Sequence, residues 1–345
     1  MVWQQRLKRY NSMQIAVIYN LVEDTKARKE EEKIADNEIL VTAEAVKHVF
    51  ISRGHDCDLV RVDSCLSELL KGKYDCIFNL AEGIDDRPSG EAEIAELLEK
   101  ICIPFTGNNS NCLSTCLDKK KTKEILVNNK ITTPNFQIFQ SENQEAKGLM
   151  YPLIVKPVNE DASIGITLNS YVVDAKQLKR KVKEVLNLYK QPALVEEFID
   201  GREINAALIG TASDVVVLPL SEIIFDFPKN IPKFLPFEAK WIESSVLYKM
   251  STGKCPAEVN SELRKKIEEL AIKCFKIMKC KGYARVDFRV KDNEPYVLEV
   301  NPNPGINPHD SGFVRSAKAF GYSFEDLILK IFSLALDGGS KKQKY

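Results

Sequence analysis

Apolar residues follow two alternating patterns along the first hundred positions. Short continuous apolar runs, typical of buried strands, are separated by stretches in which apolar residues recur every three or four positions, as in amphipathic helices. The runs occupy residues 13–19, 56–62 and 74–80, and the helical stretches occupy residues 37–53, 64–70 and 91–101. Strands that alternate with helices predict a parallel sheet covered by helices. Residues 13–107 are therefore expected to form an α/β domain.

The pattern changes after residue 107. A lysine-rich helical stretch, a strand at residues 151–157 and a helix from Asp174 predict a small α+β unit over residues 108–193. A third unit, residues 194–340, is expected to contain strands at residues 194–199, 203–209 and 215–224, a proline-rich loop at 225–250 and a long helix. One face of that helix is predicted to lie in a core, because its apolar residues are spaced by three and four: Leu263, Ile267, Leu270, Cys274 and Met278.

Residues 283–305 predict a hairpin that brings acidic side chains together. Side chains alternate between the faces of a strand, so Arg285, Asp287 and Arg289 share one face. On the return strand Glu299 and Asn301 are expected on that same face, with Leu298 and Val300 on the other. A turn centred on Asn293 sets Asp287 opposite Glu299, where like charges about 5 Å apart are destabilising.

Two interpretations of this acidic pair remain open. Two carboxylates and an Asn carbonyl are hard oxygen ligands, suited to Mg²⁺ that carries phosphate oxygens in its other positions. Alternatively, the face is exposed and Arg285 and Arg289 neutralise the acids. The polar loop Asn301-Pro-Asn-Pro-Gly305, which can offer backbone N–H groups to a ligand, favours the metal site.

Composition narrows the class of protein. The chain has 345 residues and a formal net charge of zero, so bulk attraction to nucleic acid or to an anionic membrane is not expected. Its beginning lacks the hydrophobic core of a signal peptide, and a cytoplasmic protein is expected. Nine cysteines without a Cys-x-x-Cys pair are expected to be reduced packing thiols. Three scattered histidines give little support to a zinc cage or a Cys–His catalytic pair.

Several lysines occur where an anion could use them. Lys119 begins a helix, although the run 119–123 could equally be one solvated face. Lys156 ends an apolar strand, where an unpaired ammonium would be costly, and Lys240 lies in a long loop that could fold over a ligand. Together with a loop containing Ser163 and Gly165, these residues could hold ATP. Neither a Walker-type phosphate loop nor a Gly-x-Gly-x-x-Gly motif is present.

These residues resemble the ATP-grasp carboxylate–amine ligases, and within them the D-alanine–D-alanine ligase family. The resemblance extends over about residues 74–334. It is carried by Pro104-Phe-Thr-Gly107, Leu117-Asp-Lys119 with Thr122-Lys123, Val155-Lys-Pro157, Val195-Glu-Glu-Phe-Ile-Asp-Gly-Arg-Glu203, Glu238-Ala-Lys240, Cys255-Pro-Ala257, Gly282-Tyr-Ala-Arg-Val-Asp287, Leu298-Glu-Val-Asn301 and Pro304-Gly305. It implies a parallel-sheet N-terminal domain followed by an ATP-grasp module of two α+β subdomains.

The resemblance also implies roles for single residues. Lys119 and Lys156 would contact the ATP phosphates, Glu196 the adenine end with Glu197 beside it, and Glu203 the ribose. Two Mg²⁺ ions, with Mn²⁺ as an alternative, would bind Asp287, Glu299 and Asn301. Catalytic roles are implied for three residues: Arg285 would stabilise the acyl phosphate and tetrahedral intermediate, Lys240 would close over the γ-phosphate, and Ser163 would supply the hydroxyl of the phosphate loop.

The chain departs from the family where amino acids bind. The segment Tyr19-Asn-Leu-Val-Glu-Asp24 replaces the Gly-Gly-x-Ser-x-Glu signature that anchors the first substrate. In the loop after Gly305, Asp310 stands where the family has a serine for the second substrate's carboxylate. Either Ser311 or a shifted register takes over this role, or the acceptor is something other than a free D-amino acid. Glu82 and Glu91 are candidate partners for a substrate ammonium, although a solvated loop and helix start explains them as well.

The expected activity is the ATP-dependent joining of two amino acids through an acyl phosphate, as in peptidoglycan synthesis, by a cytoplasmic homodimer. A ligase for another amino acid or a specialised metabolite remains an alternative, as does a kinase that stops at the acyl phosphate. A regulatory nucleotide binder is less well supported, because it would have little use for the complete set Arg285, Asp287, Glu299 and Asn301. The charged run 26–33 is interpreted as solvated, with a mobile active-site loop as the alternative.

Overall fold

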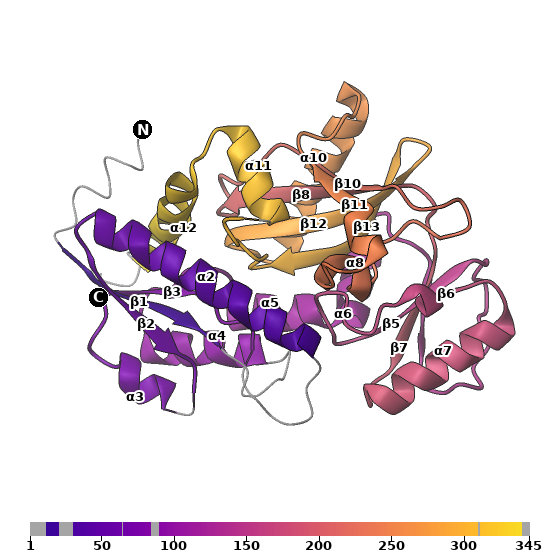
Figure 1. Cartoon of the computed structure of the whole chain (residues 1–345), viewed down its shortest axis with the longest axis horizontal. Helices are drawn as coiled ribbons and strands as arrows, with labels where there is room; N and C mark the ends of the chain where they lie inside the picture. Colours follow the sequence, from indigo (N-terminus) through magenta and orange to yellow (C-terminus); the bar gives the residue numbers. More distant parts are fainter. Residues whose placement is uncertain (1–11, 21–29, 64, 84–89, 310, 340–345) are drawn as a thin grey trace.

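In a computed structural model, the structure describes residues 12–20, 30–63, 65–83, 90–309 and 311–339, which form three β-sheets and their covering helices (Figure 1). The first sheet has the order β2-β1-β3 and is parallel. Its strands are β1 (Gln14–Tyr19), β2 (Asp56–Arg61) and β3 (Cys76–Asn79). The expected parallel sheet is confirmed.

Helices cover both faces of this first sheet. The long helix α2 (Glu30–Ser52) packs on β1 and β2, and Ala43, Val46 and Phe50 are buried there. On the other side, α3 (Leu66–Leu70) and α4 (Gly90–Ile101) bury Leu66, Leu70, Ile94 and Leu98. Ile94 and Leu98 belong to the apolar stripe expected from the sequence.

The second sheet is antiparallel, with the order β4-β7-β5-β6. Its strands are β4 (Phe136–Phe139), β5 (Leu153–Pro157), β6 (Tyr171–Val172) and β7 (Ala193–Glu197), and α7 (Ala175–Leu188) covers one face. The strand around residue 194, expected in the third unit, instead pairs with β4 and β5. The sequence could not reveal this partner because its apolar run suits either sheet. The limits 108–193 and 194–340 remain predictions.

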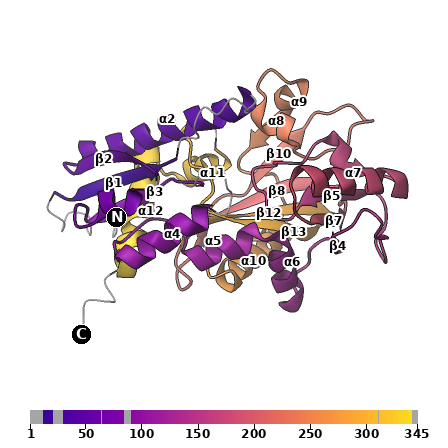
Figure 2. The ribbon, with the colours of Figure 1, turned by 90° about the horizontal axis from the view of Figure 1, so that it is seen from below.

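The third sheet is also antiparallel and follows the order β11-β10-β8-β12-β13, with β9 paired to β8. The strands are β8 (Arg202–Gly210), β9 (Val216–Val217), β10 (Ser221–Phe225), β11 (Ser251–Lys254), β12 (Gly282–Lys291) and β13 (Glu294–Pro302). Seen from below, α5 (Ser110–Leu117), α6 (Lys119–Asn128) and α10 (Ser261–Ile277) lie along this sheet (Figure 2). Leu263, Ile267 and Cys274 of α10 are buried, as predicted.

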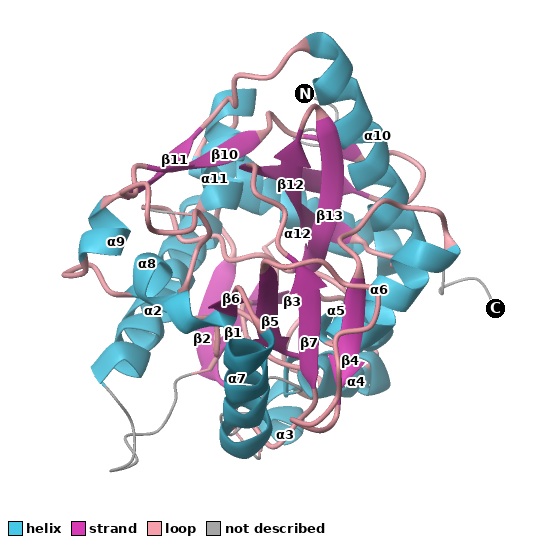
Figure 3. Ribbon diagram, turned by 90° about the vertical axis from the view of Figure 1, so that its right-hand side faces the viewer, coloured by secondary structure: helices cyan, strands magenta, loops and turns pink. Residues whose placement is uncertain are grey.

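Two parts of the third unit differ from expectation. The single strand expected at residues 215–224 is divided into β9 and β10, because Pro219 lacks the N–H that a continuous ladder needs. The proline-rich loop contains two short helices, α8 (Phe237–Trp241) and α9 (Val246–Lys249), and a small core of Phe225, Phe227, Ala239 and Leu247. Figure 3 shows these helices beside β10 and β11.

The last two helices join the third sheet to the N-terminal domain. Helices α11 (Gly312–Phe320) and α12 (Phe324–Gly339) follow the hairpin, and α12 contacts α2, β3 and β12. Phe332 of α12 packs against Phe50 of α2, with ring centroids 4.8 Å apart and ring planes tilted by 59°. One continuous core therefore fixes the N-terminal sheet relative to β8 and β12.

The acidic hairpin forms with Asp287 opposite Glu299, as predicted, but through a different turn. Asp292 and Asn293 have φ of 52° and 59° and make a two-residue turn between Lys291 and Glu294. That turn alone would pair Asp287 with Leu298. A β-bulge at Leu298 adds one residue to the return strand and restores the pairing with Glu299.

Candidate active site

A cavity of about 650 Å³ opens between the three sheets and contains most residues expected to carry chemistry. The expected residues along its wall are Glu82, Glu91, Lys156, Ser163, Glu196, Glu197, Glu203, Lys240, Arg285, Asp287, Glu299, Asn301, Gly305 and Ser311. Leu298 also lines it, so the prediction that Leu298 faces away from Glu299 was wrong. The bulge turns this side chain toward the cavity side.

Asp287 accepts several short hydrogen bonds in the cavity. Arg285 donates from Nε and Nη2 to its two carboxylate oxygens, at 2.7 Å each. Asn205 of β8 donates to Oδ1 at 2.7 Å, and Asn301 of β13 donates to Oδ2 at 2.8 Å. Asp287 is 6 % exposed, so these donors offset the cost of burying its charge.

Glu299 faces Asp287 across the hairpin and is held in its charged form by cations. Burial alone would raise the pKa of Glu299, but Lys119, Lys156 and Arg285 outweigh it and hold this pKa below its ordinary value. The two carboxylates and the amide oxygen of Asn301 fit Mg²⁺, which prefers oxygen ligands. The described residues form no cluster of three or more His, Cys, Asp or Glu placed to hold a metal.

A buried ion triad closes the other side of the cavity. Glu196 of β7 contacts the ammonium of Lys123 at 2.5 Å and that of Lys156 at 2.8 Å. Glu196 and Lys123 are each 1 % exposed. Although burial would raise the pKa of Glu196, the two lysines lower it to about 2. The triad joins α6 to the second sheet directly behind the cavity.

Lys123 was not among the residues that the sequence singled out as a site. It lies in a run of lysines on α6, where the sequence favoured Lys119 as the phosphate contact. The Lys119 ammonium donates to the backbone carbonyl of Glu160, whereas Lys123 donates to Thr133 Oγ1 at 2.7 Å and contacts Glu196. A signal existed: Lys123 follows Lys119 by four positions, which places both on one face of the helix.

Glu203 and Arg289 form a second buried pair on neighbouring strands. Arg289 Nη2 lies 3.1 Å from a Glu203 oxygen, and the guanidinium also donates to the backbone carbonyls of Gly201 and Lys233. Burial raises the pKa of Glu203 despite Arg289. Glu197 differs, because its carboxylate accepts from the backbone N–H of Met150 and from Asn135 and so fastens strand ends.

Two loops meet over the cavity near Lys240 and Ser163. Trp241 of α8 donates to the carbonyl of Ala162 at 2.8 Å, and Ser163 Oγ donates to the carbonyl of Leu235 at 3.2 Å. Ala162 and Ser163 both have positive φ, 54° and 64°, so the loop is tightly folded. Burial and the nearby Arg285 lower the pKa of Lys240. An anion beside Lys240 would restore the stability of its charged form.

Comparisons with known proteins identify this arrangement. Residues 124–333 match the family model described as "D-ala D-ala ligase C-terminus". A D-alanine–D-alanine ligase of Carboxydothermus hydrogenoformans is 36% identical over 314 residues, which cover 88% of this chain and 95% of that protein. The chain belongs to the D-alanine–D-alanine ligase family.

Two further similarities were found, and the second of them supports the fold. An uncharacterized protein of Sinorhizobium fredii is 35% identical over 263 residues, covering 75% of this chain and 74% of that protein. The crystal structure of a D-alanine–D-alanine ligase from Bacillus anthracis complexed with ATP has a TM-score of 0.75 and 23% identity, and covers 96% of this chain and 100% of that one. The expected ATP-grasp fold is thus confirmed.

Asn303 lines the end of the cavity nearest the N-terminal domain. Asn303, with φ of 54°, donates to Glu91 at 2.9 Å and accepts from the backbone N–H of Asn108 at 2.8 Å. Burial raises the pKa of Glu91 well above its ordinary value. Asn303 therefore ties the loop after the acidic hairpin to α4 and to the start of α5.

Asn79 is a further residue at this end that the sequence did not single out. Its side chain is 2 % exposed, and its Nδ2 has no hydrogen-bond partner among the residues that the structure describes. It ends β3 and lines the cavity with Glu82, whose backbone N–H donates to Asn20 Oδ1 at 2.7 Å. Asp310 lies outside the described residues, as do residues 21–24 of the altered signature and residues 26–29 of the charged run.

Proposed function

We propose that this family member is an ATP-dependent carboxylate–amine ligase that joins D-alanine to D-alanine. The observation that carries the proposal is the group formed by Asp287, Glu299, Asn301 and Arg285 on one hairpin in a cavity. Family membership supports the use of ATP and a divalent cation, and two Mg²⁺ ions are proposed because the family resemblance implies them.

The reaction has two steps. A carboxylate oxygen of the first amino acid attacks the γ-phosphorus of ATP, ADP leaves, and an acyl phosphate forms. The amine nitrogen of the second amino acid then attacks the acyl carbon, and inorganic phosphate leaves as the peptide bond forms. Both steps concentrate negative charge on oxygens at the hairpin, where preorganised cations lower the barrier.

Each group has a defined task in this proposal. Mg²⁺, when bound, neutralises the phosphate oxygens. Arg285 is fixed by its two bonds to Asp287, so its remaining N–H groups stay oriented toward the cavity as charge develops on the acyl group. Lys156 and Lys240 supply further positive charge along the phosphate path, and the loops that meet at Ala162 and Trp241 exclude water from it.

The metal site is tested by Glu299→Gln, with Glu294→Gln as the matched control on the same hairpin. Glu294 lies at the exposed turn, so Glu294→Gln removes the same charge at a position outside the cavity. The proposal expects Glu299→Gln to remain folded at the assay temperature, as measured by circular dichroism, and to lose at least 100-fold in Mg²⁺-dependent phosphate release with D-alanine. The control should keep wild-type turnover. Equal turnover in both variants would remove the metal assignment.

The setting of the enzyme is part of the same proposal. No described helix has the length and apolar character of a membrane span. A cytoplasmic location and a homodimer follow from the family resemblance, and small amino acids are the proposed partners. Sedimentation at micromolar concentration tests the dimer, because a mass of about 39 kDa would identify a monomer.

A further inference from the structure

Arg315 lies at the cavity wall and was not singled out from the sequence. It is on α11 and lines the cavity together with Ser311 and Gly312 of the same segment and Gly253 of β11. A Cβ atom on Gly253 would lie only 2.2–2.4 Å from three guanidinium atoms of Arg315. The guanidinium therefore occupies the space that any other residue at position 253 would fill.

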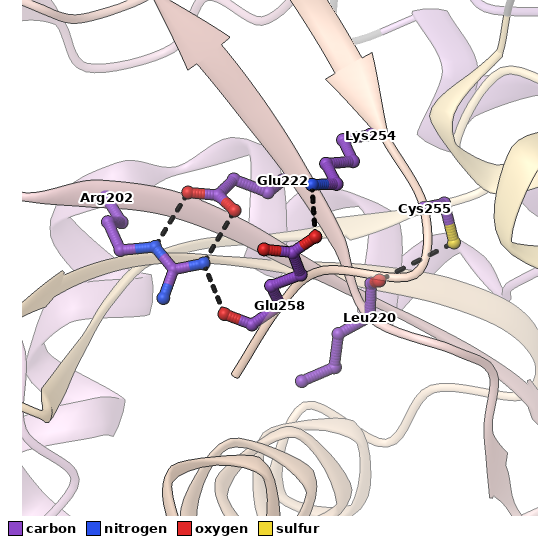
Figure 4. A network of polar contacts seen from close by, with 6 residues as sticks. All are labelled: Arg202, Leu220, Glu222, Lys254, Cys255 and Glu258. Carbon is purple, nitrogen blue, oxygen red and sulfur yellow. Dashed lines mark hydrogen bonds and ion pairs between the residues drawn. The ribbon is translucent and has the colours of Figure 1, made fainter. Parts of the chain in front are cut away.

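The strand that contains Gly253 is held in place by a network of charges (Figure 4). Arg202 of β8 makes two bonds to Glu222 of β10, at 2.7 and 2.6 Å, and a third to the carbonyl of Glu258 at 2.8 Å. Lys254, next to Gly253, donates to the Glu258 carboxylate at 2.6 Å. The bidentate pair of Arg202 with Glu222 fixes β10 against β8, and Gly253 is paired with Ile223 of β10 in the antiparallel ladder.

The helix that contains Arg315 is equally well anchored. Phe313, Val314 and Ala317 are buried in the core shared with the N-terminal domain. Just before this helix, Ser311 donates to the carbonyl of Gly305, so the loop that follows the hairpin turns back on itself. This turn connects Asn301 to Arg315 along one wall of the cavity, and a cation on a rigid helix suits specific recognition.

The chemistry of the proposed reaction suggests which anion a cation at this wall would meet. The carboxylate of the first amino acid is consumed at the hairpin, where Arg285 and the metal ligands lie. The carboxylate of the amine-donating amino acid survives the reaction and needs a partner elsewhere. A guanidinium matches a carboxylate through two parallel N–H···O bonds.

Resting on the proposed function, we propose that Arg315 binds the carboxylate of the amine-donating substrate and that Gly253 keeps the space this guanidinium needs. Arg315 then makes the enzyme select amino acids over simple amines at the second position. The serine that the family pattern places at position 310 is not required for this recognition.

A competition experiment tests the inference independently of total activity. D-Alanine and D-alaninamide are supplied at equal concentration with Mg·ATP. Only D-alanine has a carboxylate to activate, so both dipeptide products share the same first residue. The ratio of D-alanyl-D-alanine to D-alanyl-D-alaninamide is read by mass. Wild-type protein is compared with Arg315→Met, Arg315→Lys, Gly253→Ala and, as a control on the exposed face of α10, Arg264→Gln.

The inference predicts that Arg315→Met lowers the acid-to-amide product ratio at least tenfold from the wild-type value. Arg315→Lys should give a ratio between those of Arg315→Met and wild type, because it keeps the positive charge but lacks the two parallel N–H donors of the guanidinium. Gly253→Ala should lower the ratio by displacing the guanidinium. Arg264→Gln should match wild type. A wild-type ratio in Arg315→Met would overturn the inference, as would an equal loss in Arg315→Met and Arg315→Lys accompanied by a lowered melting temperature, which indicates a structural role.

Failure of the inference can be separated from failure of the proposed function. Hydroxylamine converts an acyl phosphate to a hydroxamate, so hydroxamate formation by wild-type protein from D-alanine and ATP requires no second amino acid. If hydroxamate forms while the Arg315→Met ratio stays at the wild-type value, only the inference fails. If no hydroxamate forms, the proposal that D-alanine is the activated carboxylate fails. Calorimetric titration with D-alanine and with D-alaninamide in the presence of Mg·ADP then tests the role of Arg315 without turnover. Equal affinities for the two compounds would overturn the inference about Arg315.

Discussion

The buried triad of Lys123, Glu196 and Lys156 gives a quantitative prediction for stability. Glu196→Gln keeps the shape of the side chain but leaves two ammonium groups without their counterion in a nearly water-free site. Removing one partner of a buried ion pair costs about 3–5 kcal/mol. The fall in the pKa of Glu196 from its ordinary 4.5 to about 2 corresponds to about 3 kcal/mol, which agrees with the lower end.

This free energy converts to a measurable shift in melting temperature. At about 2.1 cal/mol/K of unfolding entropy per residue, a loss of 3 kcal/mol lowers the melting temperature of a 345-residue chain by about 4 °C. Scanning calorimetry at pH 7 on wild type and Glu196→Gln measures it. Glu262→Gln, which loses only a highly exposed ion pair with Lys266, is the control and should change the melting temperature by less than 1 °C.

Adding Lys123→Met to Glu196→Gln should recover part of the lost stability, because it removes one of the two uncompensated ammonium groups together with the carboxylate.

The pH dependence of the free energy of unfolding has a definite sign. Since the folded-state pKa of Glu196 is depressed, its contribution is fully present above pH 4.5 and is lost as the pH falls toward about 2. An unchanged melting temperature in Glu196→Gln, or a double variant less stable than the single one, would refute this reasoning.

Two further predictions concern Lys240 of α8 and the contact between Gly107 and the loop after the hairpin. Lys240→Met should lower the rate of phosphate release about 100-fold, because it removes a preorganised cation from the phosphate path, and stopped-flow phosphate detection measures this. An effect under threefold would exclude that role. Gly107→Ala should lower the melting temperature by several degrees, since Gly107 has φ of 88° and its Cβ would lie 2.4 Å from Asn303 Oδ1. Wild-type stability in this variant would contradict the described contact.

Local alternation was sufficient to predict the chemistry of the hairpin. Because side chains alternate along a strand, the sequence placed Asp287 opposite Glu299 and beside Arg285, and the structure has this arrangement. The bulge at Leu298 was not predictable, since a one-residue insertion in the ladder leaves no mark in the apolar pattern. The correct pairing arose because a shorter turn and an added residue compensate for each other.

Interactions between distant segments were the part that the sequence could not supply. Lys123 looks like its neighbours in the run 119–123, and only the approach of β7 makes it a buried partner of Glu196. In the sequence, Arg315 looks like any polar residue of an amphipathic helix. Only its contact with Gly253 of β11 distinguishes it. Likewise, the core between Phe50 and Phe332 joins segments almost 300 residues apart, and no local pattern specifies such contacts.

The most direct test of the central claim is product formation from Mg·ATP and D-alanine. Phosphate release is measured with D-alanine present and absent, and the products are identified by mass. The account predicts D-alanyl-D-alanine formed in a 1:1 ratio with released phosphate and no release without the amino acid. Tight Mg·ATP binding with no phosphate release, or release without a dipeptide, would contradict it.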